Sequence, residues 1–370
     1  MKIPNGQQII EEFEKWSPKY LAMEGDPIGL HVGTLNKKIE RVLVTLDVNE
    51  DVVDEAIAKG AGLIIAHHPP IFRPLRNLQT DFPQGRLMEK LIKSDVAVYA
   101  AHTNLDVAEG GVNDLLADAL GLKNTSVLVP TYEAELVKIA VFVPESHEEA
   151  VREAFGKAGA GAIGDYEYCS YTLSGTGRFR PTADADPYIG EAGKMEKTAE
   201  SKVEVVVRKN EKDRVIKAMM AAHPYEEVAY DVFTLENKEI AMGLGRVGTL
   251  ETPMTLKGFA DWTKQQLDVP SLRLVGDPDA LIKKVAVLGG DGNKYIQQAK
   301  RAGADVYVTG DMYFHVAQDA QAMGLNIIDP GHHVEKVMIQ GVVDHMAKQQ
   351  PTWQCEFLPS QTNTEPFRFI

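Results

Sequence analysis

Two adjacent histidines, His67 and His68, directly follow four apolar residues, 63–66, in a stretch bounded by glycine and proline. An apolar run of this length is typical of a short strand buried in a parallel sheet that is covered on both faces. In open α/β sheets ligands bind at the carboxyl ends of the strands, so both imidazole rings are expected at the edge where chemistry is usually done. Taken alone, a His-His pair favours a packing role, and the rest of the chain changes that balance.

Further ligand types follow other predicted strands. His102 and Asp106 come after the apolar residues 96–101, and His332 and Glu335 follow another such run. His332 and Glu335 are three residues apart at the start of a predicted helix, so they share a helix face and both could reach one ion. Imidazole nitrogen and carboxylate oxygen suit Zn, Mn, Fe or Co better than Ca or Mg, and the Irving–Williams order leaves the choice among the four open.

These residues together predict a metal centre rather than structural histidines. Two ions roughly 3.5–4 Å apart would lower the pKa of a water molecule to about 7 and prepare it to attack an electrophile. Glu335 is the candidate bridge, with His67 and His68 on one ion each, and zinc is our first expectation for two divalent ions per chain. His102 and His333 are candidates for further ligands or for groups that orient a ligand, and His102 is also the candidate acid or base. The expected metal ligands are His67, His68, Asp106, His332 and Glu335.

An internal repeat explains how remote residues could meet. Laying residues 285–287 on 42–44 brings 305–309 onto 62–66, and a shift for a shorter loop brings 326–332 onto 96–102. Each copy ends a strand in histidine and has a carboxylate shortly beyond it. Two α/β lobes packed about a pseudo-twofold axis would bring these groups into one cleft.

The elements of the first lobe read as a β-α-β unit with a crossover helix. Residues 41–47 predict a strand, Asn49 is a candidate N-cap for a helix over 50–59, and the strand before His67 follows. In the third segment, the glycine alternation at 243–248 is weak support for phosphate binding, and we interpret it as turn chemistry.

Between the lobes, the order of predicted elements is β-α-β-β-α-β, the split ferredoxin-like pattern. Residues 180–198 form a long excursion within it, and His223 before Pro224 indicates a cap or turn rather than a metal ligand. We therefore expect an α/β protein in which residues 1–126 and 237–370 form one composite metal-binding domain, and residues 127–236 form an inserted α+β domain.

Composition limits the function classes. The chain has 370 residues, of which 44% are hydrophobic and 25% charged, as in soluble globular proteins. A net charge of -14 argues against non-specific nucleic-acid binding, although a nucleotide could occupy a local pocket. No apolar run is long enough to span a membrane or to act as a signal peptide, so the expected location is cytoplasmic. Two cysteines are too few for a disulfide framework.

Three stretches carry a resemblance to a known family: Ala66-His67-His68-Pro69-Pro70, His102-Thr103-Asn104-Leu105-Asp106 and Gly331-His332-His333-Val334-Glu335. They resemble the signatures of the NIF-three-like family, whose members are also called GTP cyclohydrolase I type 2 homologues. The resemblance implies a dinuclear centre on the five residues named above and a ring-shaped homohexamer. It also implies an inserted module like the PII and CutA proteins, as in longer bacterial members. Some members space the last histidine and glutamate one residue further apart, so His333 is an alternative to His332.

Two functions remain open from the sequence. The first is a metal-dependent hydrolase that uses metal-activated water, with GTP as the substrate that the family name implies. The second is a non-catalytic, metal- or nucleotide-responsive regulatory hexamer that binds a small molecule. Hydrolysis requires an open coordination position and a nearby acid or base, whereas sensing requires only reversible binding.

Overall fold

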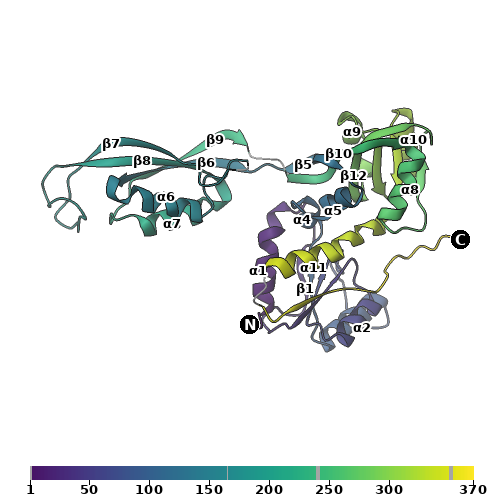
Figure 1. The fold of residues 1–370 in the computed structure, drawn as a ribbon. Helices are drawn as coiled ribbons and strands as arrows, with labels where there is room; N and C mark the ends of the chain where they lie inside the picture. The colour runs from purple at the N-terminus through teal and green to yellow at the C-terminus, as the bar shows by residue number, and fades with distance from the viewer. Residues whose placement is uncertain (1, 165, 239–241, 350–352) are drawn as a thin grey trace. The chain divides into compact units, whose positions relative to one another are not determined.

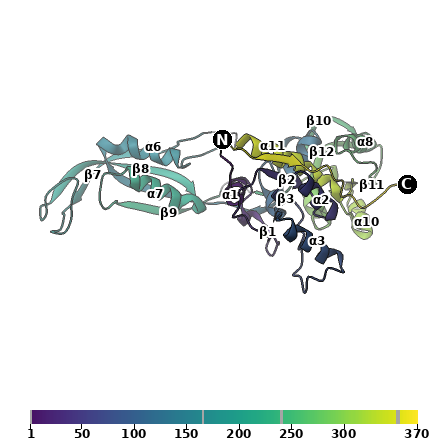
Figure 2. The same cartoon turned by 90° about the horizontal axis from the view of Figure 1, so that it is seen from below.

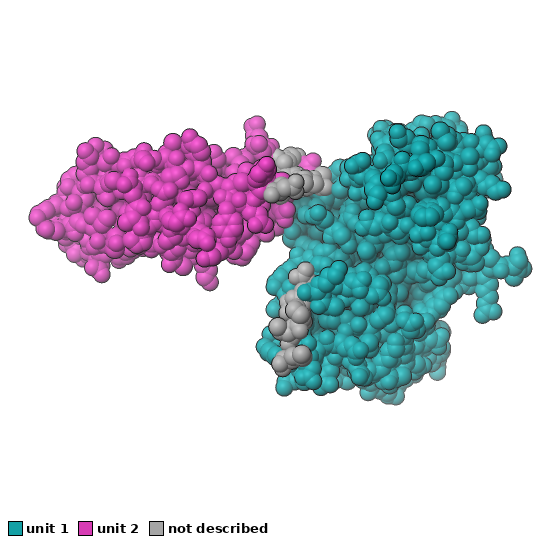
Figure 3. All heavy atoms as spheres, in the orientation of Figure 1, with its two compact units in different colours: residues 1–132, 242–370 teal, residues 133–241 magenta. Residues whose placement is uncertain are grey.

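The computed structural model describes residues 2–164, 166–238, 242–349 and 353–370. It divides into two compact units, coloured separately in Figure 3: Met1–Tyr132 with Met242–Ile370, and Glu133–Ala241. The expected boundaries after residues 126 and 236 fall a few residues earlier than these. The difference arises because strand β5 (Lys123–Tyr132) pairs with β10 (Met242–Thr255) inside the first unit.

The first unit contains two sheets, and the first sheet carries His67 and His68. Its strands lie in the order β1-β4-β3-β2-β15, with β1 antiparallel to β4 and all other pairs parallel. Asn49 caps the crossover helix as predicted, since its side chain accepts a hydrogen bond from the backbone of Val52. The strands are β1 (Gly29–Val32), β2 (Arg41–Thr45), β3 (Leu63–Ala66), β4 (Ala97–Ala100) and β15 (Glu356–Pro359). The helices of this part are α1 (Gly6–Trp16), α2 (Glu50–Ala58), α3 (Pro83–Lys93), α4 (Thr103–Val107) and α5 (Val112–Ala119), with a 3-10 turn at Lys19–Leu21.

The second sheet has the order β11-β14-β13-β12-β10-β5. Its parallel strands β12, β13 and β14 follow the same spatial order as β2, β3 and β4, and each sheet adds one antiparallel strand beside the last of the three. The further strands are β11 (Arg273–Val275), β12 (Leu281–Asp291), β13 (Val306–Gly310) and β14 (Asn326–Asp329). The helices are α8 (Leu256–Gln266), α9 (Ile296–Arg301), α10 (Phe314–Ala322) and α11 (Val337–Gln349), with 3-10 turns η4 (Asn293–Tyr295) and η5 (His332–Lys336).

The interpretation of residues 243–248 as a turn is wrong, because they lie in β10 between β5 and β12. Here the glycines allow neighbouring strands to approach closely, because they have no Cβ atom. A Cβ on Gly243 would lie 2.0 Å from the carbonyl oxygen of Val129, and Gly245 has a φ of +65°, which glycine adopts without steric cost. Sequence alone does not distinguish such a glycine-rich strand from a loop.

One hydrophobic core joins the two sheets. Successive strand residues face opposite sides of a sheet, and Val42 and Val44 share a buried cluster with Val285 and Val287. The buried apolar residues of α1, α5 and α11 belong to the same cluster, and Figure 1 shows α11 running through the middle of this unit. The other face of the first sheet, including Leu43, packs against α2 and α3. The two lobes therefore form a single α/β domain, and its described helices include none with the length and apolar character needed to cross a membrane.

The second unit has the predicted β-α-β-β-α-β order. Its antiparallel sheet has the order β7-β8-β6-β9, and helices α6 and α7 cover one face of it (Figures 1 and 2). The elements are β6 (Glu135–Pro144), α6 (Glu148–Lys157), β7 (Tyr171–Phe179), β8 (Glu196–Arg208), α7 (Lys212–Ala222) and β9 (Tyr230–Lys238), with 3-10 turns at Glu145–His147 and Lys209–Glu211. The sheet residues that face the helices are Val and Ile, which alternate with mixed residues on the open face, as an inserted α+β domain requires.

Candidate metal centre

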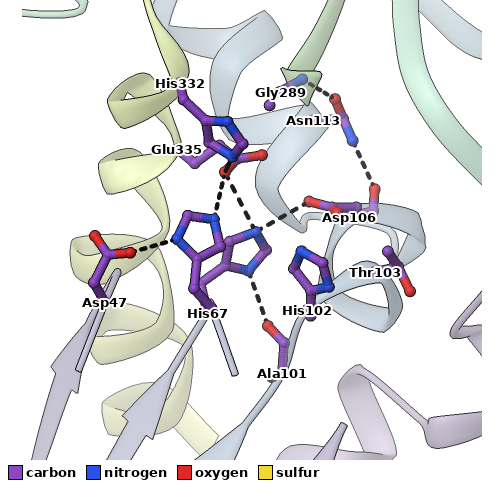
Figure 4. A network of polar contacts seen from close by, with 12 residues as sticks. Asp47, His67, Ala101, His102, Thr103, Asp106, Asn113, Gly289, His332 and Glu335 are labelled. Atoms are coloured by element: carbon purple, nitrogen blue, oxygen red, sulfur yellow. Dashed lines mark hydrogen bonds and ion pairs between the residues drawn. The ribbon is translucent and has the colours of Figure 1, made fainter. Parts of the chain in front are cut away.

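The predicted ligands meet at the carboxyl ends of strands from both sheets (Figure 4). His67 and His68 follow β3, and Asp106 lies on the short helix α4 after β4. His332 and Glu335 lie on η5, after β14 of the second sheet. Groups that are more than two hundred residues apart in the chain therefore surround one space.

Among the predicted ligands, His67 is the most deeply buried, with no exposed surface. Its Nδ1 lies 2.9 Å from the carbonyl oxygen of Ala101. Because a carbonyl can only accept, Nδ1 carries the proton and Nε2 is directed at the carboxylates. Nε2 lies 3.5 Å from Asp106 Oδ1 and 3.7 Å from Glu335 Oε2. Both His67 Nε2 and Asp106 Oδ1 are buried without a hydrogen-bond partner. Such atoms are costly unless something else binds them.

His68 and His332 are held in matching ways. The Nδ1 atom of His68 lies 2.7 Å from Asp47 Oδ1, and that of His332 lies 2.7 Å from Asp311 Oδ2. Their Nε2 atoms lie 3.0 and 3.2 Å from Glu335 Oε2. A carboxylate or carbonyl on the outer ring nitrogen is the usual arrangement for a metal-ligating histidine, because it fixes the ring and increases its basicity.

The charges of the cluster shift several pKa values. Burial alone would raise the pKa of Glu335, but hydrogen bonds from the surrounding imidazoles outweigh burial and hold it well below its usual range. Burial raises the pKa of Asp106 to about 6. Burial opposes protonation of His68, yet Asp47 and Glu335 raise its pKa to about 10, and Glu335 above all raises the pKa of His332 to about 9. The cluster therefore attracts positive charge, which protons supply when no metal ion is bound.

The described residues include several groups that could hold a metal ion. Three groups of side chains each have ligand atoms within 4.8 Å of one another, and Glu335 belongs to two of these groups. The groups are His67 with His68 and His102, His68 with His332 and Glu335, and His67 with Asp106 and Glu335. The buried atoms of His67 and Asp106 without partners are the observation that an ion would explain.

His102 lies beside the cluster, and its Nδ1 is 2.8 Å from Asp26 Oδ1. Asp26 also accepts hydrogen bonds from the backbone and hydroxyl of Thr103. Burial would raise the pKa of Asp26, but its bonds to His102 and Thr103 lower it, so Asp26 is a carboxylate. His102 is thus oriented with its second nitrogen available to a ligand or a proton.

His333 is not brought into the cluster. Its Nε2 lies 3.3 Å from the hydroxyl of Thr364, and burial lowers its pKa. The structure therefore places His332, rather than its neighbour, among the candidate ligands.

Several supporting residues were not predicted. Asp47 and Asp311 follow strands β2 and β13 at the same sheet edges as the histidines, which is the signal that could have identified them. Asn113 has no such signal: its Nδ2 donates to the backbone carbonyl of Asp106 at 2.9 Å, and its Oδ1 accepts from the backbone of Gly289 at 3.0 Å. Asn113 thus links the two lobes directly at the centre (Figure 4).

A cavity of about 680 Å³ opens beside the cluster. His68 and His332 line it together with Asp47, Asp311 and Arg273, and apolar side chains of the C-terminal segment form another wall. A small molecule in this cavity would therefore lie next to the imidazoles of the centre.

Known proteins share the sequence and the fold of this chain. The model of a family described as Duf34/NIF3 (NGG1p interacting factor 3) matches residues 4–366. A Bacillus subtilis (strain 168) protein named GTP cyclohydrolase 1 type 2 homolog is 57% identical over 371 residues, with 100% of both chains covered. The crystal structure of a Bacillus cereus protein related to NIF3 has a TM-score of 0.96 and 56% identity, and that of Staphylococcus aureus protein SA1388 has 0.78 and 32%. Both cover 100% of each chain. The chain therefore belongs to the DUF34/NIF3 family.

Proposed function

We propose that the chain is a metal-dependent hydrolase with two divalent ions, zinc first among the candidates, on the five residues predicted as ligands. The observation that carries the proposal is the pair of buried atoms without partners, His67 Nε2 and Asp106 Oδ1, 3.5 Å apart and close to Glu335. Removing two such groups from water is unfavourable unless a cation joins them. The proposed ligands are His67, His68, Asp106, His332 and Glu335.

When bound, paired divalent ions would activate a water molecule for attack on an electrophile. The chain's own residues supply the rest of the chemistry. Glu335 would help to hold both ions, and three imidazoles already converge on its carboxylate. Asp26 keeps the Nδ1 proton of His102 in place, so the other nitrogen of that ring can take up or release a proton during turnover.

The substrate would occupy the cavity beside His68 and His332. GTP is the first candidate, because the close relative from Bacillus subtilis is named as a homolog of GTP cyclohydrolase 1 type 2. Arg273 lines the cavity with two thirds of its side chain exposed, and a guanidinium group binds phosphate well. A family name does not by itself identify a substrate, so GTP is a candidate to be tested.

The second candidate function is a non-catalytic, metal- or nucleotide-responsive homohexamer. The observation that favours it is the inserted unit, which has its own hydrophobic core and its own cavity. A sensing role needs only reversible binding at the centre, and sedimentation of the purified protein would test the hexamer.

The deciding experiment measures metal content by plasma emission on protein purified without chelator, followed by product analysis with GTP. We expect about two ions per chain in the wild type, fewer in His68→Ala and Glu335→Gln, and wild-type content in the control His333→Ala. Formation of a ring-opened product from GTP by the wild type, but not by Glu335→Gln, would support the hydrolase. Full metal content without turnover would instead favour the sensor or another substrate. Absence of metal from every preparation would leave the histidines structural and refute both.

A further inference from the structure

The inserted unit contains a second cavity, of about 370 Å³, that has no part in the metal centre. It lies where the end of β7 and the start of the following excursion meet β8 and the turn after α7. A volume of this size lies within the range of small-molecule sites. Its walls combine aromatic rings with the carboxylates of Glu200, Glu226 and Glu227, and the local sequence explains how Glu200 is placed.

The turn after α7 is held rigidly by His223, which the sequence predicts to be structural. His223 Nδ1 accepts a hydrogen bond from the backbone of Tyr225 at 3.1 Å, and its Nε2 lies 3.0 Å from the carbonyl oxygen of Phe142. Both nitrogens are used, so the ring is neutral and does not bind a metal ion. Its effect is to fix the position of Tyr225 against strand β6.

Tyr225 in turn fixes a carboxylate in the cavity. Its hydroxyl donates to Glu200 Oε1 at 2.9 Å. The other oxygen, Oε2, lies over Gly177 of β7, and a Cβ at that position would be 2.1 Å from it. Glycine is therefore required for this placement of Glu200. A carboxylate has about four acceptor sites, so Glu200 can accept further hydrogen bonds from a ligand.

Aromatic rings surround this carboxylate. The ring centre of Tyr225 lies 6.0 Å from that of Phe179 and 6.2 Å from that of Tyr188, and Phe142 completes the walls. The faces of aromatic rings carry partial negative charge and attract cations within about 6 Å. The nearby ammonium group of Lys202 is paired with Glu204 at 2.7 Å, and in the described part of the chain no cationic side chain pairs with Glu200.

We propose that this cavity binds a small organic molecule through a cationic amine, with the carboxylate of Glu200 as its counter-ion and the rings of Phe142, Phe179 and Tyr225 as its walls. Two sources share this chemistry, a simple amine and an amino-acid zwitterion. Arg178 and Arg180 also line the cavity and would distinguish them, because a guanidinium group binds the carboxylate that only the zwitterion carries.

The test titrates the full chain with three molecules of similar size, phenethylamine, phenylalanine and 3-phenylpropionate, by ligand-observed NMR and calorimetry. We expect the two amines to bind and the acid not to bind. Glu200→Gln should weaken amine binding at least tenfold. Gly177→Ala should do the same by displacing the carboxylate, and the two variants check each other if one folds poorly. The matched control is Glu149→Gln, an exposed charge on α6 of the same unit.

Tighter binding of phenylalanine than of phenethylamine would identify the ligand class as a zwitterion whose carboxylate is bound by the arginines. The reverse order would identify it as a simple amine. Binding of 3-phenylpropionate as tight as that of phenethylamine would overturn the proposal. So would the absence of binding by all three molecules, or amine affinity unchanged in both Glu200→Gln and Gly177→Ala.

Discussion

The carboxylates behind two of the candidate ligands allow a quantitative test of the metal centre. Asp47 and Asp311 each lie 2.7 Å from the outer nitrogen of a histidine whose inner nitrogen faces Glu335. Asparagine keeps the size but removes the charge, so the ring loses both orientation and basicity. Losing such a partner typically lowers metal affinity 10- to 100-fold, or about 1.4–2.7 kcal/mol. We expect this loss in Asp47→Asn and Asp311→Asn, measured by zinc competition against a chromophoric chelator.

The loss should be confined to part of the centre. His67 is held by the backbone carbonyl of Ala101, which neither substitution touches, so one ion should remain bound with nearly wild-type affinity. Asp118→Asn, an exposed change on α5 with the same charge difference, is the control. Zinc affinities within twofold of wild type in both variants would show that these carboxylates do not support metal ligands and would refute the reasoning.

Three further predictions concern the centre and the insertion. The pKa values of His68 and His332 are raised to about 10 and 9, so both rings are protonated below those values and an ion must displace the protons. Zinc affinity should therefore rise between about pH 6 and 9 with measurable proton release in calorimetry, and a flat profile would contradict this. Gly289→Ala should lower metal content without unfolding the domain, because its Cβ would lie 2.9 Å from Glu335 Oε1; unchanged content would show that the carboxylate has room to move. Replacing residues 133–241 by a short linker should leave a folded protein with wild-type metal content, since the strands that flank the insertion end as a hydrogen-bonded pair; aggregation would show the opposite.

The candidate ligand set could be predicted from sequence because each group follows a recognisable strand. An apolar run buried on both faces, such as β3, identifies a central strand of a sheet. The histidines follow the carboxyl end of that strand. Among the supporting groups, Asp47 and Asp311 carry the same signal, because they also follow strands. A residue whose role depends only on hydrogen bonds to remote groups cannot be identified from composition and spacing. Asn113 is such a case, since its two bonds join residues 106 and 289.

The C-terminal segment was missed for a related reason. Its strand pairs with residues more than three hundred positions earlier, and no local pattern predicts a partner at that distance. The pairing also brings Thr364 to the carboxylate of Asp47, so the end of the chain reaches the supporting groups of the centre.

The position of β15 at the edge of the first sheet has a consequence for biosynthesis. Strand β2 is translated more than three hundred residues before its neighbour on one side, Glu356–Pro359. Domains generally fold in order of synthesis, yet this edge of β2 stays open until β15 has been synthesised. The nascent first lobe would therefore depend on rapid synthesis of the intervening residues, or on a chaperone that covers the edge, to avoid pairing with other chains.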